Sequence, residues 1–137
     1  MAKLPQYELE HVAISVSDID RTIEWYGANF GFEEVARSDK PALAAKVALM
    51  RLGDGILEIF EPYEPKPLPV GESTLASSLQ RLGAKHMALA VDDVALACDL
   101  LRANGVEIET DIVEGTTSKY LFCKDPDGIL IEIIQRK

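Results

Sequence analysis

Two histidines, His11 and His86, are the only ones in the chain, and each opens a short stretch of the same pattern. The nine residues HVAISVSDI that begin at His11 align without a gap with the nine residues HMALAVDDV that begin at His86. Imidazole nitrogen is a common ligand of divalent transition metals. Because the two histidines occupy equivalent positions of an internal repeat, they indicate a metal site more strongly than a single strand histidine would.

A glutamate follows each histidine at a nearly constant distance along the chain. Glu58 and Glu132 both lie inside apolar, strand-like segments. A carboxylate among strand aliphatics is costly to bury unless it is paired or binds a metal, although an alternating strand can also direct it to solvent. Two imidazoles and two carboxylates suit a borderline divalent ion such as Ni, Co, Zn, Mn or Fe, with coordination positions left for water or substrate. We therefore predict one divalent metal held by His11, Glu58, His86 and Glu132.

The strands that carry the histidines have one small and one large face. Side chains two residues apart share a face, so His11 lies with Ala13 and Ser15, and His86 lies with two alanines. Small side chains leave open volume beside the histidines, as a ligand cavity requires. The opposite faces suit packing under helices and carry Val12, Ile14, Val16, Met87, Leu89 and Val91.

Both halves of the chain predict the same order of elements, a strand, a helix and three more strands. Helix starts are indicated by Ser17 or Asp18 and by Asp92 or Asp93, and helix ends by the segments 29–31 and 104–105. The alternation that follows predicts strands at 32–37, 46–52 and 55–61 in the first half, and at 107–112, 119–124 and 129–135 in the second. Tight turns are expected at 53–55 and 125–128.

The pattern predicts an α+β fold of two βαβββ modules, residues 8–61 and 84–136, in one domain that spans residues 1–137. Residues 62–83 join the modules. Residues 62–70 contain four prolines and predict a surface loop, either a plain linker or a cover over a cleft, and residues 73–82 predict a short helix.

Composition excludes several classes of function. A net charge of −9 argues against nucleic acid and anionic membranes as partners. The first residues show no signal-peptide pattern, and no apolar run approaches the ~20 residues of a membrane span. Cys98 and Cys123 form no metal-binding or disulfide pattern and are expected to be buried free thiols, as in a reducing cytoplasm.

The chain resembles the vicinal oxygen chelate superfamily over about residues 8–136. The resemblance is carried by the repeat, by the spacing of its histidines and glutamates, and by Asp125-Pro126-Asp127-Gly128 before Glu132. That superfamily includes glyoxalase I, methylmalonyl-CoA epimerase, extradiol dioxygenases, and bleomycin and fosfomycin resistance proteins. The resemblance implies that the two modules form a partly open, mostly antiparallel barrel around a metal cleft, and its metal ligands fall on the four residues named above.

Within the superfamily the matches point to two kinds of enzyme. Four metal ligands and the Asp-Pro-Asp-Gly turn are similar to glyoxalase I (lactoylglutathione lyase), whereas the long segment after Glu58 is similar to methylmalonyl-CoA epimerase. Bacterial glyoxalase I has an arginine and an asparagine that contact glutathione where this chain has Ser15 and Pro62. The epimerase has a second acidic base where this chain reads Lys40-Pro41-Ala42-Leu43. The substrate is therefore left open as a small molecule with a carbonyl or a thioester.

The chemistry implied by the four-ligand relatives is proton transfer at a carbon next to a carbonyl. The base would be Glu132, which matches the glutamate shared across the superfamily, with Glu58 as the second candidate. Ser15 and Phe60 share strand faces with the ligands and are either pocket-lining or ordinary barrel residues. The rival function is a non-catalytic, drug-binding protein of the bleomycin-resistance kind. Four-ligand relatives often form dimers, some with each metal site built from two chains, so a homodimer is expected. The alternative is that the long segment 62–82 lets the two halves of one chain close on each other.

Overall fold

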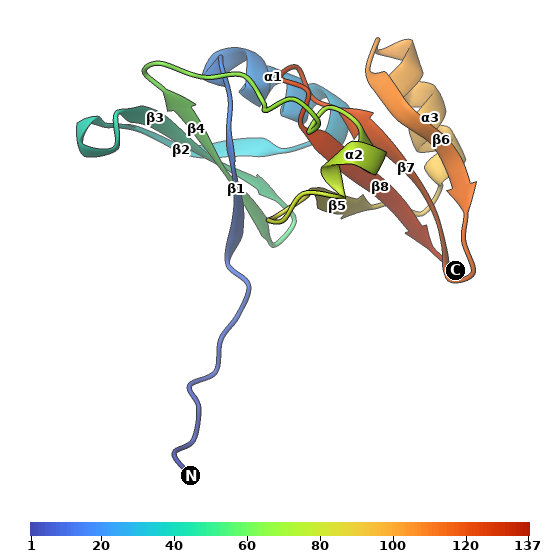
Figure 1. Ribbon diagram of the computed structural model, residues 1–137, viewed down its shortest axis with the longest axis horizontal. Coiled ribbons are helices and arrows are strands. Elements are labelled where there is room, and N and C mark those ends of the chain that lie inside the picture. Colours follow the sequence, from blue (N-terminus) through green and yellow to red (C-terminus); the bar gives the residue numbers. More distant parts are fainter.

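The computed structural model describes residues 1–137 and contains two four-stranded sheets, one in each half of the chain (Figure 1). The predicted α+β class and the repeated βαβββ order are confirmed. The first half forms β1 (His11–Ser15), α1 (Ile19–Phe30), β2 (Glu33–Lys40), a 3-10 turn (Pro41–Leu43), β3 (Ala45–Leu52) and β4 (Gly55–Pro62). The second half forms β5 (Met87–Ala90), α3 (Val94–Ala103), β6 (Glu107–Glu114), β7 (Ser118–Lys124) and β8 (Leu130–Arg136), with α2 (Leu75–Ser78) between the halves.

The two sheets have the same strand order, β1-β4-β3-β2 in the first module and β5-β8-β7-β6 in the second. The first strand of each module runs parallel to the last strand, and the remaining pairs are antiparallel. No strand of one sheet pairs with a strand of the other, so the chain by itself forms two open sheets and no closed barrel.

Both long helices begin and end at the predicted signals. Asp18 caps α1 by accepting a hydrogen bond from the Arg21 backbone N–H, and Asp93 caps α3 in the same way from Leu96, each at 3.0 Å. The second of the two candidate residues is thus the cap in both repeats. Helix α1 ends at Gly31, whose φ of 82° lies in the left-handed region that a residue without a β-carbon adopts freely.

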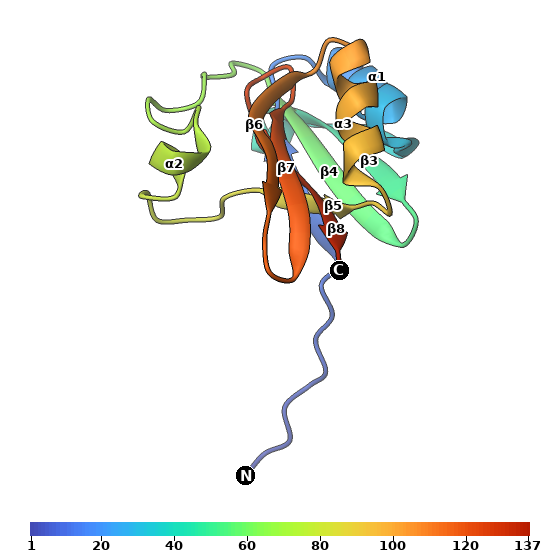
Figure 2. The same ribbon diagram turned by 90° about the vertical axis from the view of Figure 1, so that its right-hand side faces the viewer.

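Helices α1 and α3 lie side by side on one face of the sheets, and the segment that contains α2 lies on the opposite face (Figure 2). A single hydrophobic cluster takes side chains from both modules, among them Tyr26 and Leu101 from the helices. Val16 is buried in this cluster, and Ile14, Met87, Leu89 and Val91 pack partly against it, as predicted. Val12 departs from the prediction, since it is 40% exposed near the start of the edge strand β1.

The segment between the modules has less regular structure than predicted. Pro62 ends β4, and the remaining residues of the proline-rich segment, 63–70, form an irregular loop, as expected from the prolines. The helix expected at 73–82 is only four residues long, and Ser78 is its single buried residue. A short helix is stable only when tertiary packing holds it, and one buried side chain provides little packing.

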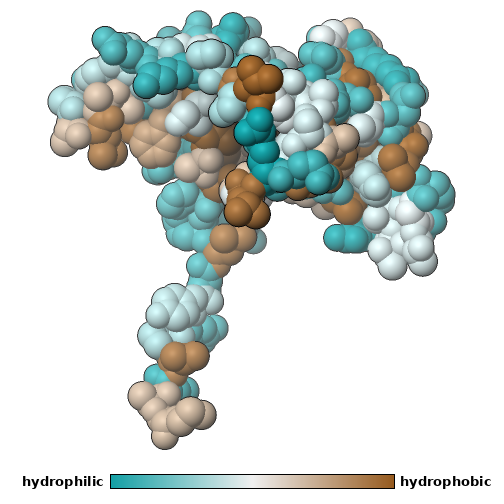
Figure 3. Space-filling model, viewed as in Figure 1, coloured by the Kyte–Doolittle hydropathy of each residue, from teal (hydrophilic) through white to brown (hydrophobic).

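The first ten residues project from the body of the molecule and bury no side chain (Figure 3). Leu4 and Leu9 are among the most exposed apolar residues of the chain. None of the helices is long and apolar enough to cross a membrane.

Candidate metal centre

The first histidine–glutamate pair lies on the first sheet. His11 begins β1, Glu58 is in β4, and the two strands are parallel neighbours in which Ala13 is the partner of Glu58. This register brings the His11 Nε2 atom to 3.6 Å from the Glu58 Oε1 atom. Parallel pairing of the first and last strands thus joins two residues that are far apart in the sequence.

The second pair repeats this arrangement on the second sheet. His86 directly precedes β5, Glu132 is in β8, and Ala88 is the partner of Glu132. The His86 Nε2 atom lies 3.1 Å from the Glu132 Oε2 atom. In both modules the glutamate therefore stands opposite the residue two positions after the histidine.

Both pairs are open to solvent without being fully exposed. The four side chains have relative exposures between 17% and 40%. The small residues on the same strand faces, Ala13 and Ser15 in one sheet and Ala88 and Ala90 in the other, are exposed, as predicted. Each pair thus lies on the face of its sheet that faces away from the helices.

The chain does not bring the two pairs together. It contains no group of three or more His, Cys, Asp or Glu side chains that could hold a metal ion. The modules contact each other through α1, α3 and the buried faces of the sheets, and the two histidine–glutamate pairs stay apart within one chain. The predicted set of four residues is therefore present as two half-sites.

Two neighbours of the half-sites were not singled out from the sequence. The Glu10 carboxylate hydrogen-bonds the Nδ1 atom of His11 and raises the pKa of that histidine. Phe122, the partner of Glu132 in β7, contacts the His86 ring edge to face with centroids 4.7 Å apart. Glu10 could have been noticed because it adjoins His11, whereas Phe122 becomes visible only once the register of β7 and β8 is known.

A cavity of about 430 Å³, the loop pocket, lies between the end of β1, the proline-rich loop and the turn before β8. Ser15, Pro62, Lys66 and Asp127 are among its lining residues, and Lys66 is the only basic one. Asp127 is held in place because its carboxylate accepts hydrogen bonds from the hydroxyl and the backbone N–H of Ser17, at 2.5 and 3.0 Å. Ser15 lines this loop pocket, whereas Phe60, its partner in β4, does not.

The two cysteines are buried free thiols, as predicted. Burial raises the pKa of the Cys123 thiol to about 12. A thiol with such a pKa stays protonated at neutral pH and is a poor nucleophile or metal ligand. The cysteines therefore belong to the core.

Known protein families provide a match for most of the chain. Residues 8–133 match the model of the Glyoxalase/Bleomycin resistance protein/Dioxygenase superfamily. The chain belongs to this superfamily. The match covers both modules and all four residues of the half-sites, so the resemblance to the vicinal oxygen chelate proteins is confirmed.

Named members of the superfamily resemble the chain over nearly its whole length. A probable lactoylglutathione lyase of Vibrio cholerae is 27% identical, with 98% of this chain and 94% of that protein covered. The lactoylglutathione lyase of Escherichia coli O157:H7 is 28% identical, with 94% and 93% covered. The structure of a glyoxalase family protein from Enterococcus faecalis superimposes with a TM-score of 0.77 at 28% identity, with 93% of this chain and 96% of that one covered.

Proposed function

We propose that this protein is a divalent-metal-dependent lyase or isomerase, similar to lactoylglutathione lyase, that moves a proton next to a carbonyl group. The observation that carries the proposal is the matched pair of histidine–glutamate half-sites, at the same register position in both modules. A protein that only binds a drug or metabolite has no need of four ligand-type side chains on open sheet faces. The relatives named lactoylglutathione lyase support the same class of reaction.

The half-sites fit a divalent transition metal by their donor atoms. Each supplies one imidazole nitrogen and one carboxylate, which is the mixed N and O donor set that Ni, Co, Zn, Mn and Fe accept. The His86–Glu132 distance of 3.1 Å and the His11–Glu58 distance of 3.6 Å allow both members of a pair to reach one ion. A pair alone is a weak site, because stable metal sites usually have three or more protein ligands.

We infer that the complete site forms between two chains. The His11–Glu58 pair of one subunit would face the His86–Glu132 pair of the other, and twofold symmetry would generate two identical sites per dimer. The support is that each pair lies on an open sheet face while the opposite faces are already used for contact between the modules. The two modules of one chain would have to separate before the two histidines and two glutamates could meet.

Glu132 is the residue that would take the substrate proton, and Glu58 is the second candidate. A metal ion at the half-sites would polarise the substrate carbonyl and stabilise the negative charge that develops when the neighbouring proton leaves. Glu132 lies within 3.1 Å of His86, so both side chains can reach one ion, and Phe122 packs against the His86 ring on the same face of the sheet. The same carboxylate can return the proton to the adjacent carbon.

The loop pocket would hold the part of the substrate that does not react. Ser15 lies on the same face of β1 as His11, so the pocket begins at the end of the face that carries the first half-site. Ser15 and Pro62 offer no charge to an anionic group such as a glutathione or coenzyme A carrier, whereas Lys66 does. Lys66 is therefore the residue that would attract an acidic substrate handle.

Mixing two inactive variants tests both the metal site and its location. His11→Ala and His86→Ala should each lose the metal, measured by elemental analysis after desalting. A mixed dimer of the two variants contains one intact set of four residues if the site lies between chains. We expect the mixture to regain up to half a metal ion per chain and activity toward glutathione hemithioacetals or acyl-CoA thioesters.

Three outcomes would count against parts of this proposal. Full metal content in both single variants would show that the histidines are not ligands. No recovery in a mixture shown to contain mixed dimers would place the site within one chain. A mixture that regains metal and turns over neither substrate class would favour the binding-protein alternative.

A further inference from the structure

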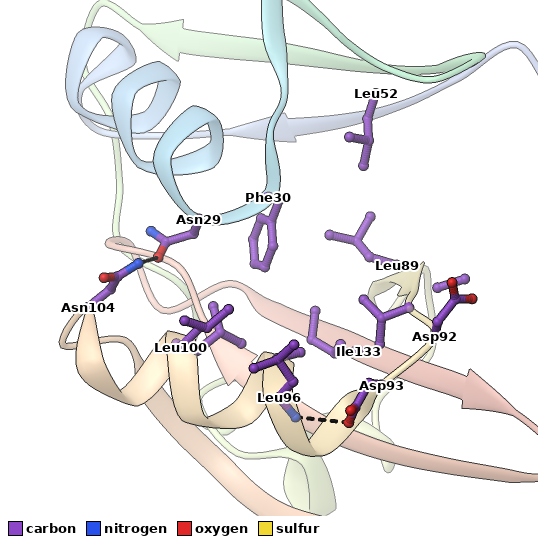
Figure 4. A pocket seen from close by; sticks show the side chains of 14 residues that line it. Asn29, Phe30, Leu52, Leu89, Asp92, Asp93, Leu96, Leu100, Asn104 and Ile133 are labelled. Atoms are coloured by element: carbon purple, nitrogen blue, oxygen red, sulfur yellow. Dashed lines mark hydrogen bonds between the residues drawn. The ribbon is translucent and has the colours of Figure 1, made fainter.

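A second cavity, which we call the helix cavity, lies between α1 and α3 (Figure 4). Its volume is about 540 Å³, within the range of pockets that hold small molecules. Most of the residues that line it are apolar, and none is basic. The apolar lining includes Phe30, Leu52, Leu89, Leu96, Leu100 and Ile133.

The helix cavity is separate from the metal half-sites. Its floor contains Leu89 and Ile133, which are partners on β5 and β8, and Ile133 is almost completely buried. Side chains alternate between the two faces of a strand, so Glu132 points to the opposite face from its neighbour Ile133. A molecule in the cavity would therefore lie behind the strands that carry the second half-site, without contact with the metal ligands.

The two ends of the helix cavity differ in chemistry. At one end the side-chain amide of Asn104 donates a hydrogen bond to Asn29 at 3.1 Å, and at the other end lie Asp92 and Asp93 (Figure 4). The Asp93 carboxylate is engaged as the N-cap of α3, whereas Asp92 is exposed and does not cap the helix. The cavity thus combines a long apolar wall with one acidic end.

We propose that the helix cavity binds a small amphiphilic cation, with its apolar body between Phe30 and Leu96 and its ammonium group at Asp92 and Asp93. The ten residues of α3 extend over ~15 Å, which is long enough to cover an alkyl or arylalkyl chain. Burial of apolar surface would supply most of the affinity, and the two carboxylates would favour a positively charged ligand. A fatty anion would meet the two carboxylates at the acidic end, and no basic side chain lines the cavity itself, although Arg136 lines a neighbouring pocket with Asp92.

A second copy of the chain is a poorer occupant of this cavity than a small cation. The chain carries a net charge of −9, so another copy would bring further negative charge to an acidic rim. The deepest part of the cavity reaches Ile133, which a broad protein surface cannot approach. Both observations favour a small, positively charged ligand.

Trp25 provides a direct reporter of binding. It is the only tryptophan, and its ring packs edge to face on Phe30 with centroids 5.4 Å apart. Titration with octylamine, which is protonated at neutral pH, should change the Trp25 emission, and calorimetry should give about one amine per chain. Octanol should bind more weakly and octanoate more weakly still. Equal affinities for all three probes would overturn the proposal.

Two variants and one matched control locate the probe. Asp92→Asn should weaken octylamine binding roughly two- to fivefold, the usual strength of an exposed ion pair, and leave octanol binding unchanged. Ala97→Phe fills the cavity from α3 and should abolish the binding of both probes. Asp99→Asn removes the same charge from an exposed position of α3 that does not line the cavity, and should have no effect.

Three other results would contradict the proposal. Unchanged octylamine binding in Ala97→Phe would place the amine elsewhere. If Ala97→Phe changed the sedimentation coefficient but not amine binding, the occupant of the cavity would be a second copy of the chain. Loss of octylamine binding in His86→Ala would place the amine at the metal half-site, since the two sites lie on opposite faces of β5 and β8.

Discussion

The Tyr26 hydroxyl donates a hydrogen bond of 2.9 Å to the Oδ2 atom of Asp125, across the contact between the two modules. Tyr26 is completely buried, and Asp125 is 5% exposed. The other carboxylate oxygen, Oδ1, accepts hydrogen bonds from the backbone N–H groups of Asp127 and Ile129. Helix α1 of the first module is therefore fixed to the turn that leads into β8, the strand that carries Glu132.

Removal of the Tyr26 hydroxyl should destabilise the protein. Tyr26→Phe leaves a buried carboxylate oxygen without its donor, which typically costs about 1–3 kcal/mol of unfolding free energy. Tyr63→Phe is a matched control, because the Tyr63 hydroxyl also donates to a carboxylate, that of Asp39, but on the surface. The control should lose at most about 0.5 kcal/mol. Urea unfolding followed by circular dichroism measures both values, and equal losses would contradict the importance of the buried bond.

Asp125 should give the stability a pH dependence of defined sign. Burial raises the pKa of Asp125 above its ordinary value of 3.8, so the folded protein holds this proton to a higher pH than the unfolded chain does. The contribution of Asp125 to stability is therefore fully present below about pH 3.8 and is lost as the pH rises through the raised folded value.

Asp125→Asn should remove this dependence with little other damage. The amide oxygen of asparagine can accept the two backbone N–H bonds, and its nitrogen can donate to the Tyr26 oxygen. The unfolding free energy of the parent should fall relative to that of the variant as the pH rises from about 3.8 towards neutrality. A difference that stays constant over this range would show that Asp125 does not titrate there.

Glu132→Gln should separate metal binding from proton transfer. The amide oxygen can still approach a metal but cannot take a proton, so we expect much of the metal to remain while turnover falls roughly 10²–10⁴-fold. Glu58→Gln should have a milder effect, because only one of the two carboxylates acts as the main base. Elemental analysis and solvent-deuterium incorporation into turned-over substrate measure the two properties.

Two other outcomes for these glutamate variants would change the assignment of the base. Full activity in metal-loaded Glu132→Gln would reject Glu132 as the base. Equal and severe losses in both variants would mean that the carboxylates share the proton transfer, as racemisation of an acyl-CoA substrate requires.

Lys66→Ala should affect binding of an acidic substrate and leave the chemical step unchanged. Lys66 is the only basic residue of the loop pocket, and it is exposed. Loss of an exposed charge pair should raise KM roughly two- to fivefold with kcat unchanged. Lys3→Ala in the exposed N-terminal segment is the control for net charge and should change neither constant. An unchanged KM in Lys66→Ala would exclude Lys66 from substrate binding.

The sequence by itself determined the order of elements in the two modules, the approximate starts of the two helices and the matched positions of the histidines and glutamates in the repeat. These features depend on short-range rules: alternation sets the face of a strand, and aspartate before a helix satisfies free N–H groups, as at Asp18 and Asp93. The contacts of His11 with Glu58 and of His86 with Glu132 came from the structure, because they depend on the parallel pairing of the first and last strands, which has the same register in both modules.

Only the tertiary structure decided how the modules meet. Module contact depends on side chains that are distant in the sequence, such as Tyr26 with Asp125, and no periodic pattern encodes which of many apolar faces will fit. That contact joins the helix faces, keeps the two half-sites apart within one chain and encloses the helix cavity. The edge-to-face contact of Phe122 with His86 was hidden for the same reason, since it depends on a strand register that local alternation does not set.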